Sequence, residues 1–396
     1  MDPYVTDWLD LLVRWLHVIA GMAWIGTSFY FVYLDLSLRP PPSSAVADEG
    51  VGGEFWAVHG GGFYRVQKYR VAPPVLPEPL HWFKWEAYTT WLSGFLLFVV
   101  LYWANADTLL VDPRVADISP GLAIAISAAL LALAWVVYDL LCRTLGRNDL
   151  VLAAALAAFV VAAAYATTRV FSGRAAYVEV GAMLGTMMAG NVLFNIIPAH
   201  RELVRAKEAG RDPDPEPGVR AKQRSVHNNY LTLPVVFAMI SNHFPFAYGH
   251  EHSWLVLVAL MAIGAWVRHF FNLRHRGRNA WAIPATAAVA AAALALALRP
   301  GEEETGTAVH GRVGFAQVER IVSERCAACH SVTPTRSDAA PKGIVFDTPE
   351  QIASQAAAIR RQAVESRAMP PGNATGMTNE ERALLAAWIH QGAKVR

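Results

Sequence analysis

The chain has 396 residues, of which 54% are hydrophobic and 17% are charged, and its formal net charge is +2. Soluble domains are less apolar than this, so the composition favours a membrane-embedded protein with room for a small additional domain. Lysine and arginine lie in short blocks between apolar runs, which excludes an extended surface for nucleic acid. Two of the three cysteines lie in one pentapeptide, so a disulfide framework is also excluded.

Long apolar runs predict most of the fold. A helix crosses a hydrocarbon core of roughly 30 Å with about 20 apolar residues, since unpaired backbone groups are not tolerated in lipid. The first run is too long for the apolar core of a signal peptide, and we expect it to be retained as a helix. We predict a mainly α polytopic bundle of about eight transmembrane helices, at residues 8–34, 85–103, 120–142, 150–168, 177–198, 230–246, 254–273 and 280–298.

The connecting loops predict the orientation of this bundle in the lipid bilayer. The loops after the first, third, fifth and seventh runs are basic, whereas the opposite set contains only Arg114, Arg169 and Arg174. Cytoplasmic loops retain positive charge. Eight spans then place the N-terminus and everything after Arg299 on the periplasmic side of a bacterial inner membrane.

Three connecting segments have patterns of their own. In the cytoplasmic loop at 40–80, the stretches 54–59 and 63–69 flank a glycine triplet, which predicts a β-hairpin. Residues 211–218, Arg-Asp-Pro-Asp-Pro-Glu-Pro-Gly, are expected to form a stiff polar connector. Residues 300–307 are rich in proline, glycine and glutamate, and we expect them to link a membrane domain at 1–299 to a C-terminal domain at 308–396.

The C-terminal segment contains the sequence Cys326-Ala-Ala-Cys329-His330. In a C-x-x-C-H motif the two thiols bond to the vinyl groups of haem c, and the histidine is the proximal iron ligand. A zinc site is the competing reading, but no second Cys/His pair follows at finger spacing. We predict an all-α cytochrome c domain, with Met369 as the favoured distal iron ligand and Met377 as the second candidate. Haem c is attached outside the cytoplasm, which agrees with the loop charges.

Polar residues inside apolar runs are costly in lipid and point to functional sites. Interhelical hydrogen bonding and snorkelling to lipid headgroups are the competing explanations. A planar polar ligand needs donors and acceptors from several helices near one depth. In the inner half of the bundle we predict catalytic roles for Glu86, Arg268 and His269, and substrate binding by Asn191, Asn195, Asn228, Asn229 and Thr232.

Several longer motifs are distributed along the chain. They include Gly52-Gly-Glu-Phe-Trp-Ala-Val-His59, His81-Trp-Phe-Lys-Trp-Glu86, His227-Asn-Asn-Tyr230, Ile240-Ser-Asn-His243, Arg268-His-Phe-Phe-Asn-Leu-Arg-His275 and Ala368-Met369-Pro-Pro-Gly. Together they resemble the membrane-bound urate hydroxylases of bacterial purine breakdown, and the resemblance spans almost the whole chain. It implies an eight-helix membrane domain with a C-terminal cytochrome c, which oxidises urate to 5-hydroxyisourate and passes electrons to a cytochrome c or a terminal oxidase.

Two other functions fit the same motifs. A quinol or porphyrinogen dehydrogenase would feed the same cytochrome, and a non-catalytic membrane-anchored electron carrier would use the helices only to dock a partner. The string around His17 resembles the first helix of membrane families in which this histidine is linked to haem b, including oxygen-independent protoporphyrinogen oxidases.

A haem b inside the bundle would solve a problem of distance. If urate binds in the inner half, electrons must cross much of a core of roughly 30 Å to reach a periplasmic haem. His17 and His243 are both expected in the outer half, and we predict that they ligate haem b, jointly or one with another histidine. In the alternative, urate binds in the outer half beside haem c and no relay exists.

Overall fold

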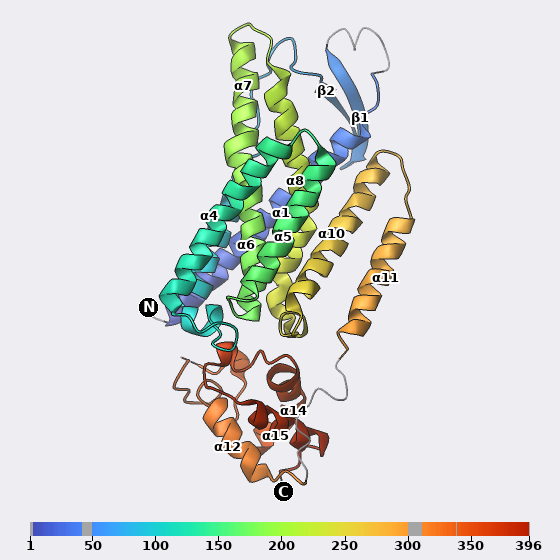
Figure 1. Ribbon diagram of the computed structural model, residues 1–396. Coiled ribbons are helices and arrows are strands. Elements are labelled where there is room, and N and C mark those ends of the chain that lie inside the picture. The colour runs from blue at the N-terminus through green and yellow to red at the C-terminus, as the bar shows by residue number, and fades with distance from the viewer. Residues whose placement is uncertain (1–2, 42–49, 300–310, 338, 396) are drawn as a thin grey trace.

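The computed structural model describes residues 3–41, 50–299, 311–337 and 339–395. The fold is mainly α-helical, with a bundle of long helices and a smaller helical domain formed by residues 311–395. Figure 1 shows this domain at the end of the bundle where α1 begins, with the β-hairpin at the opposite end. The long elements are α1 (Pro3–Ser37), α3 (Trp85–Phe98), α4 (Pro120–Leu145), α5 (Asp149–Thr167), α6 (Gly173–Gly190), α7 (Ile197–Glu208), α8 (Pro215–Ile240), α10 (Ser253–His275) and α11 (Ala282–Ala297).

Shorter turns extend or connect these helices. Helix α3 continues into the π-helical segment η1 (Val99–Trp103), and η2 (Ala106–Leu110) follows it. Between α6 and α7 the helix passes through another π-helical segment, η3 (Asn191–Ile196). The end of α8 turns through η4 (Ser241–His243) into α9 (Pro245–Tyr248).

The predicted apolar runs lie in helices, but the helices differ in length. Within the described part of the chain, five helical stretches are long and apolar enough to cross a membrane: Trp8–Ser37, Pro120–Leu145, Asp149–Thr167, Gly173–Glu208 and Ser253–His275. The runs at 85–103, 230–246 and 280–298 are helical too, although α11 has only 16 residues. About eight spans therefore remains a prediction.

Large apolar side chains cover the outward faces of these helices. On α1, 63% of the Trp15 surface and 60% of the Met22 surface are exposed, and Leu133 and Leu140 are exposed on α4. Water would not tolerate such an extended apolar surface on a monomer, whereas lipid does. The five helices and this surface indicate a multi-pass membrane protein.

Local capping explains where the helices begin. The Asn148 side chain accepts hydrogen bonds from the N–H groups of Leu150 and Val151, and Ser119 and Ser172 cap α4 and α6 in the same way. Helix α8 begins at Pro215, inside the segment 211–218 that was predicted to be a connector. Residues 211–214 are indeed non-helical, but the prediction was wrong from Pro215 onward. The helix begins there because Asp214 accepts a hydrogen bond from the N–H of Glu216 and proline is favoured in the first turn of a helix.

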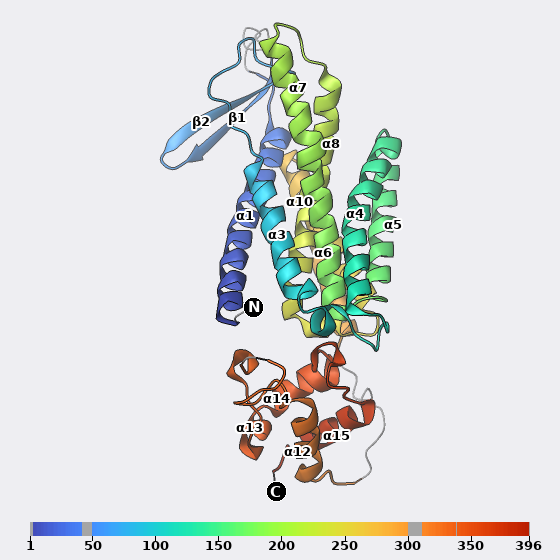
Figure 2. The same ribbon diagram turned by 90° about the vertical axis from the view of Figure 1, so that its left-hand side faces the viewer.

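The predicted hairpin is confirmed. Strands β1 (Val51–His59) and β2 (Gly62–Tyr69) pair antiparallel, and the two-residue turn uses Gly60 and Gly61 at φ angles of +56° and +81°. The hairpin is anchored to the chain leaving α1, since Arg39 and Glu54 exchange backbone hydrogen bonds of 2.9 Å. Figure 2 shows it beside the end of α1, away from α4 and α5.

The C-terminal domain has its own apolar core. It contains α12 (Phe315–Arg325), α13 (Pro349–Ser354), α14 (Ala356–Ile359) and α15 (Asn379–His390). The core includes Val318, Val322, Leu385 and Trp388. A capping box between Thr378 and Glu381 fixes the start of α15. The predicted linker at 300–307 lies outside the described residues.

A loop that precedes α15 makes one of the contacts between the two domains. The turn η7 (Pro371–Asn373) packs against η2 of the membrane domain, and the Arg114 guanidinium donates a 3.4 Å hydrogen bond to the Arg367 carbonyl. At Gly372 an added Cβ would lie 2.7 Å from the Val111 carbonyl oxygen and 2.9 Å from that of Thr108. Only glycine fits this close approach.

Candidate functional site

Three polar residues meet where α8 and α10 pack beside α1. Arg268 of α10 donates from Nε to Oδ1 of Asn229 on α8 at 2.9 Å, and Asn272 donates from Nδ2 to the same oxygen at 3.0 Å. The guanidinium carbon of Arg268 lies 3.7 Å from the ring centre of Phe29 on α1. All three polar side chains are buried. We call Asn229, Arg268 and Asn272 the inner cluster.

The inner cluster keeps polar atoms without partners. Asn229 Nδ2, Arg268 Nη2 and Asn272 Oδ1 are buried and form no hydrogen bond with any residue that the structure describes. Burying an unpaired polar group costs about 1–3 kcal/mol, so such groups are rare unless something else binds them. Two donors and one acceptor are therefore available to a polar ligand.

A second polar network is satisfied by its own members. Asn191 donates from Nδ2 to the Tyr138 hydroxyl at 2.7 Å and to Asn228 Oδ1 at 2.8 Å. Asn228 donates from Nδ2 to the Met188 carbonyl at 3.0 Å, and the Thr232 hydroxyl donates to the Asn228 carbonyl at 2.9 Å. These bonds join α4, α6, η3 and α8, which is the structural role that interhelical polar residues often have.

The predicted substrate residues therefore do not form one set. Asn229 belongs to the inner cluster, whereas Asn191, Asn228 and Thr232 belong to the satisfied network. Asn195 Nδ2 is buried without a partner in the described chain, and no hydrogen bond connects it to either group.

The structure also separates the predicted catalytic residues. His269 shares a 2.7 Å hydrogen bond with the Tyr230 hydroxyl and stacks on the Trp266 ring, so it lies to one side of Arg268. Glu86 Oε2 is buried at the start of α3 and has no partner among the described residues. No hydrogen bond or ion pair in the described chain links either residue to the inner cluster.

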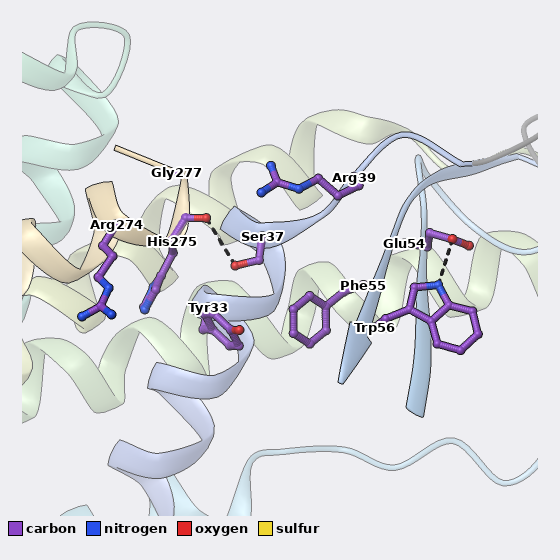
Figure 3. A pocket seen from close by; sticks show the side chains of 9 residues that line it. All are labelled: Tyr33, Ser37, Arg39, Glu54, Phe55, Trp56, Arg274, His275 and Gly277. Carbon is purple, nitrogen blue, oxygen red and sulfur yellow. Dashed lines mark hydrogen bonds between the residues drawn. The ribbon is translucent and has the colours of Figure 1, made fainter. Parts of the chain in front are cut away.

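A cavity of about 490 Å³ opens at the hairpin end of the bundle. Figure 3 shows that α1, β1 and the end of α10 form its walls. The Tyr33 ring lies 4.6 Å from the His275 ring and 5.2 Å from the Phe55 ring, measured between centroids. His275 Nδ1 is buried and unpaired within the described residues, and the His275 carbonyl accepts a 3.3 Å hydrogen bond from Ser37. The remaining lining residues are Arg39, Glu54, Trp56, Arg274 and Gly277.

The two histidines predicted to hold haem b have different surroundings. His17 Nδ1 forms hydrogen bonds with the Thr90 carbonyl at 3.0 Å and the Ser93 hydroxyl at 3.2 Å, which join α1 to α3. The ring packs on Gly94, where an added Cβ would lie 2.7 Å from Cε1. His243 is exposed in η4. Among the described residues no hydrogen bond or ring contact joins His17 to His243, and the haem b site remains a prediction.

The C-x-x-C-H pentapeptide follows α12 directly. The N–H of His330 donates to the Cys326 carbonyl at 2.9 Å, so one turn presents both cysteines and the histidine. Neither Cys326 nor Cys329 forms a disulfide, and burial raises the pKa of the Cys326 thiol to about 12. His330 Nδ1 donates to the Ile344 carbonyl at 3.0 Å, which leaves Nε2 to bind a metal. These residues fit a covalent c-type haem.

Met369 and Met377 lie in different parts of the C-terminal domain. Met377 is buried within the apolar core, so packing accounts for it, whereas Met369 packs partly buried at the edge of that core. Buried Arg382 holds the Met369 loop: its Nη1 donates to the carbonyls of Met369, at 2.8 Å, and Ala363, and its Nη2 donates to Asn373 Oδ1 at 3.2 Å. Met369 as the distal iron ligand remains a prediction.

Sequence reasoning missed several of these groups. Glu179 of α6 is fully buried; its Oε2 accepts a 2.7 Å hydrogen bond from Ser127, and its Oε1 has no partner in the described chain. An acidic residue inside an apolar run was a visible signal. The roles of His275 and Arg382 had no such signal, because their positions depend on packing between distant segments.

Comparison with known families gives one match. The family model described as urate oxidase N-terminal matches residues 3–299, which covers the helical bundle and the hairpin. Comparison with curated proteins returned no match, and neither did comparison with solved structures. The matched region is well over half of the chain, and it contains both the inner cluster and the cavity. The chain therefore belongs to the urate oxidase N-terminal family.

Proposed function

We propose that the chain oxidises urate to 5-hydroxyisourate in the membrane domain and passes the electrons to a covalent haem c in the C-terminal domain. Urate and water give 5-hydroxyisourate, two protons and two electrons, so the reaction needs a binding site, a proton acceptor and an electron acceptor. Family membership supports urate as the substrate. The main support for placing the urate site at the inner cluster is its set of unpaired buried polar atoms.

The inner cluster matches the chemistry of urate. At neutral pH urate is a planar monoanion whose edges alternate N–H and carbonyl groups. Arg268 Nη2 and Asn229 Nδ2 would donate to carbonyl oxygens, and Asn272 Oδ1 would accept from a ring N–H. Hydrogen bonds to an anion are stronger than neutral ones, and burial strengthens them further.

The proton acceptor is either Glu86 or His269. Glu86 has the stronger physical case because its Oε2 atom is buried without a partner in the described chain. His269 is already hydrogen-bonded to Tyr230, so it would act through that pair. Glu86→Gln and His269→Gln distinguish them, since loss of the base lowers kcat by about 10²- to 10⁴-fold.

Haem c supplies one-electron acceptance when bound. Cys326 and Cys329 would hold it, and His330 and Met369 would be its axial ligands. This domain would lie on the periplasmic side of a bacterial inner membrane, where a cytochrome c or a terminal oxidase collects the electrons.

The test uses the purified full-length holoprotein without oxygen, with soluble cytochrome c as acceptor. We expect urate to be consumed, 5-hydroxyisourate to appear, and Arg268→Gln to lower kcat/KM about 100-fold. Arg276→Gln, an exposed arginine two turns further along the chain, is the matched control and should change it less than twofold. Reduction by a quinol but not by urate would refute the proposal in favour of a quinol dehydrogenase.

A further inference from the structure

The cavity and the inner cluster lie along the same two helix faces. On α10, Arg268, Asn272 and His275 are four and three residues apart, so they lie on one face. His275 is about 10 Å further along the helix than Arg268, at 1.5 Å per residue. Unpaired polar atoms therefore continue from the inner cluster to the cavity wall.

The face of α1 that packs against these α10 residues also extends from the inner cluster to the cavity. Phe29, Tyr33 and Ser37 recur every four residues. Phe29 lies under the Arg268 guanidinium, whereas Tyr33 packs on the His275 ring. Ser37 then bonds to the His275 carbonyl at the rim. One aromatic and polar seam between α1 and α10 thus leads from the cavity to the inner cluster.

The charges in the cavity favour an anion. Glu54 is the acidic residue of the lining, but its carboxylate is neutralised by Arg65 at 2.6 Å and accepts a 3.1 Å hydrogen bond from Trp56 Nε1. Both contacts hold the pKa of Glu54 below its usual range, so it stays paired at neutral pH. Arg39 and Arg274 form no ion pair with any residue in the described ranges.

The shape of the cavity favours a flat ligand. Tyr33 and Phe55 contribute aromatic rings to walls built on two helices and a strand, whereas the Trp56 ring lies on the other side of β1, beside Glu54 (Figure 3). The hairpin wall is fixed by the backbone pairing of Arg39 with Glu54. The volume of about 490 Å³ is in the range of small-molecule sites.

We propose that this cavity is the entry and first binding site for the urate anion, which reaches the inner cluster from the hairpin end of the bundle along the α1–α10 seam. Substrate then enters at the end opposite the C-terminal domain, and electrons leave at the other end. This inference rests on the proposed function and adds a binding site and a direction to it.

The first test removes the two cationic groups at the cavity. In the full-length holoprotein, Arg39→Gln and Arg274→Gln should each raise KM for urate about threefold, and together about tenfold, with a smaller change in kcat. Salt should lower kcat/KM in the unchanged protein, because it screens the attraction between urate and the two arginines. In the double variant salt should lower kcat/KM much less. Arg147→Gln, an exposed arginine at the same end of the bundle, is the matched control.

The second test detects occupancy without turnover. Phe55→Cys places a thiol in the cavity wall, facing Tyr33, and Phe63→Cys places one on the exposed part of β2 outside the lining. Urate should slow the reaction of a bulky maleimide with the first thiol but not with the second. Modification at position 55, but not at 63, should then raise KM for urate.

The outcomes separate the two proposals. If the unchanged protein fails to oxidise urate, the proposed function falls and this inference falls with it. A different result is that the protein oxidises urate although the double variant keeps the KM and salt dependence of the unchanged protein and urate does not protect the cavity thiol. The entry-site proposal is then wrong, and the proposed function stands. Protection together with a higher KM in the double variant supports both.

Discussion

Asn228 and Asn229 are consecutive on α8 but have different surroundings. Asn228 faces α6, where its amide bonds to Asn191 and to the Met188 carbonyl. Asn229 faces α10, where its oxygen accepts two hydrogen bonds and its Nδ2 has no partner among the described residues. A rotation of about 100° along the helix therefore separates an amide whose hydrogen bonds are satisfied from one that keeps an unpaired donor.

This contrast predicts opposite effects for two neighbouring substitutions. Asn229→Ala should lower kcat/KM for urate about 10- to 100-fold, because a donor to the bound anion is lost. Asn228→Ala should leave kcat/KM within about twofold and instead lower the free energy of unfolding by about 1–3 kcal/mol, since its partners are left unpaired. Steady-state kinetics and thermal unfolding in detergent measure both. Equal effects on kcat/KM would contradict the assignment.

Arg382 predicts a stability effect in the C-terminal domain. Arg382→Gln removes the donors to the Met369 and Ala363 carbonyls, and we expect a loss of about 2–4 kcal/mol in unfolding free energy. The weak far-red absorption of a sulfur-ligated haem should weaken as the loop loosens. Arg361→Gln, which alters an exposed side chain of the same domain, should change neither signal. Unchanged absorption in Arg382→Gln would argue against Met369 as the ligand.

At the scale of elements, Gly372 lies at one of the contacts between the two domains. Gly372→Ala would place a methyl group against the Val111 and Thr108 carbonyls, so the loop must move away from η2. We expect haem c reduction by urate to slow about tenfold, because electron transfer depends steeply on distance, while reduction by ascorbate stays the same. Stopped-flow absorption measures both rates.

Gly376 is the matched control for this prediction. Its φ of +67° strains an alanine as much as the φ of +54° at Gly372 does, but an added Cβ meets nothing within 4 Å. Gly376→Ala should therefore leave the urate-driven rate unchanged. If both variants slow it equally, backbone strain and not domain docking explains the effect.

Local sequence patterns predicted a helix or strand well where the same local residues determine its conformation. The glycine turn predicted the hairpin, and apolar runs predicted the helices. The start of α8 was missed because proline and aspartate favour both connectors and first helical turns, and only the Asp214 cap decides between them. The π-helical segments η1, η2 and η3 have no sequence pattern that would have predicted them.

For the candidate site, the sequence predicted which residues take part but not which of them contact one another. Sequence identified Arg268 and Asn229 as polar residues near one depth, but it grouped them with Asn191 and Asn228, whose partners lie on other helices. Which amide is satisfied depends on the packing of α4, α6 and α10 around α8. The cavity depends on the hairpin docking against α1 and α10, which no local pattern describes.

At the scale of the whole molecule, Arg268 and Asn272 lie in the second half of α10, which ends at the cavity wall. The C-terminal domain lies at the other end of the bundle (Figure 1). A long separation favours an intermediate electron carrier, and the predicted haem b between them gives a direct assay. We expect non-covalent haem to be extractable from the purified protein and to fall by at least half in His17→Ala. Thr6→Ala, near the start of α1, is a control with no predicted role. A preparation that oxidises urate but holds only covalent haem would eliminate this relay.

The measurement closest to the central claim is an anaerobic titration of the oxidised full-length protein with urate, followed in the visible absorption of the covalent haem. The account predicts that urate alone, without quinol or oxygen, reduces this haem and yields 5-hydroxyisourate, and that Asn229→Ala weakens the response. A haem that ascorbate reduces but that stays oxidised in excess urate would contradict the account.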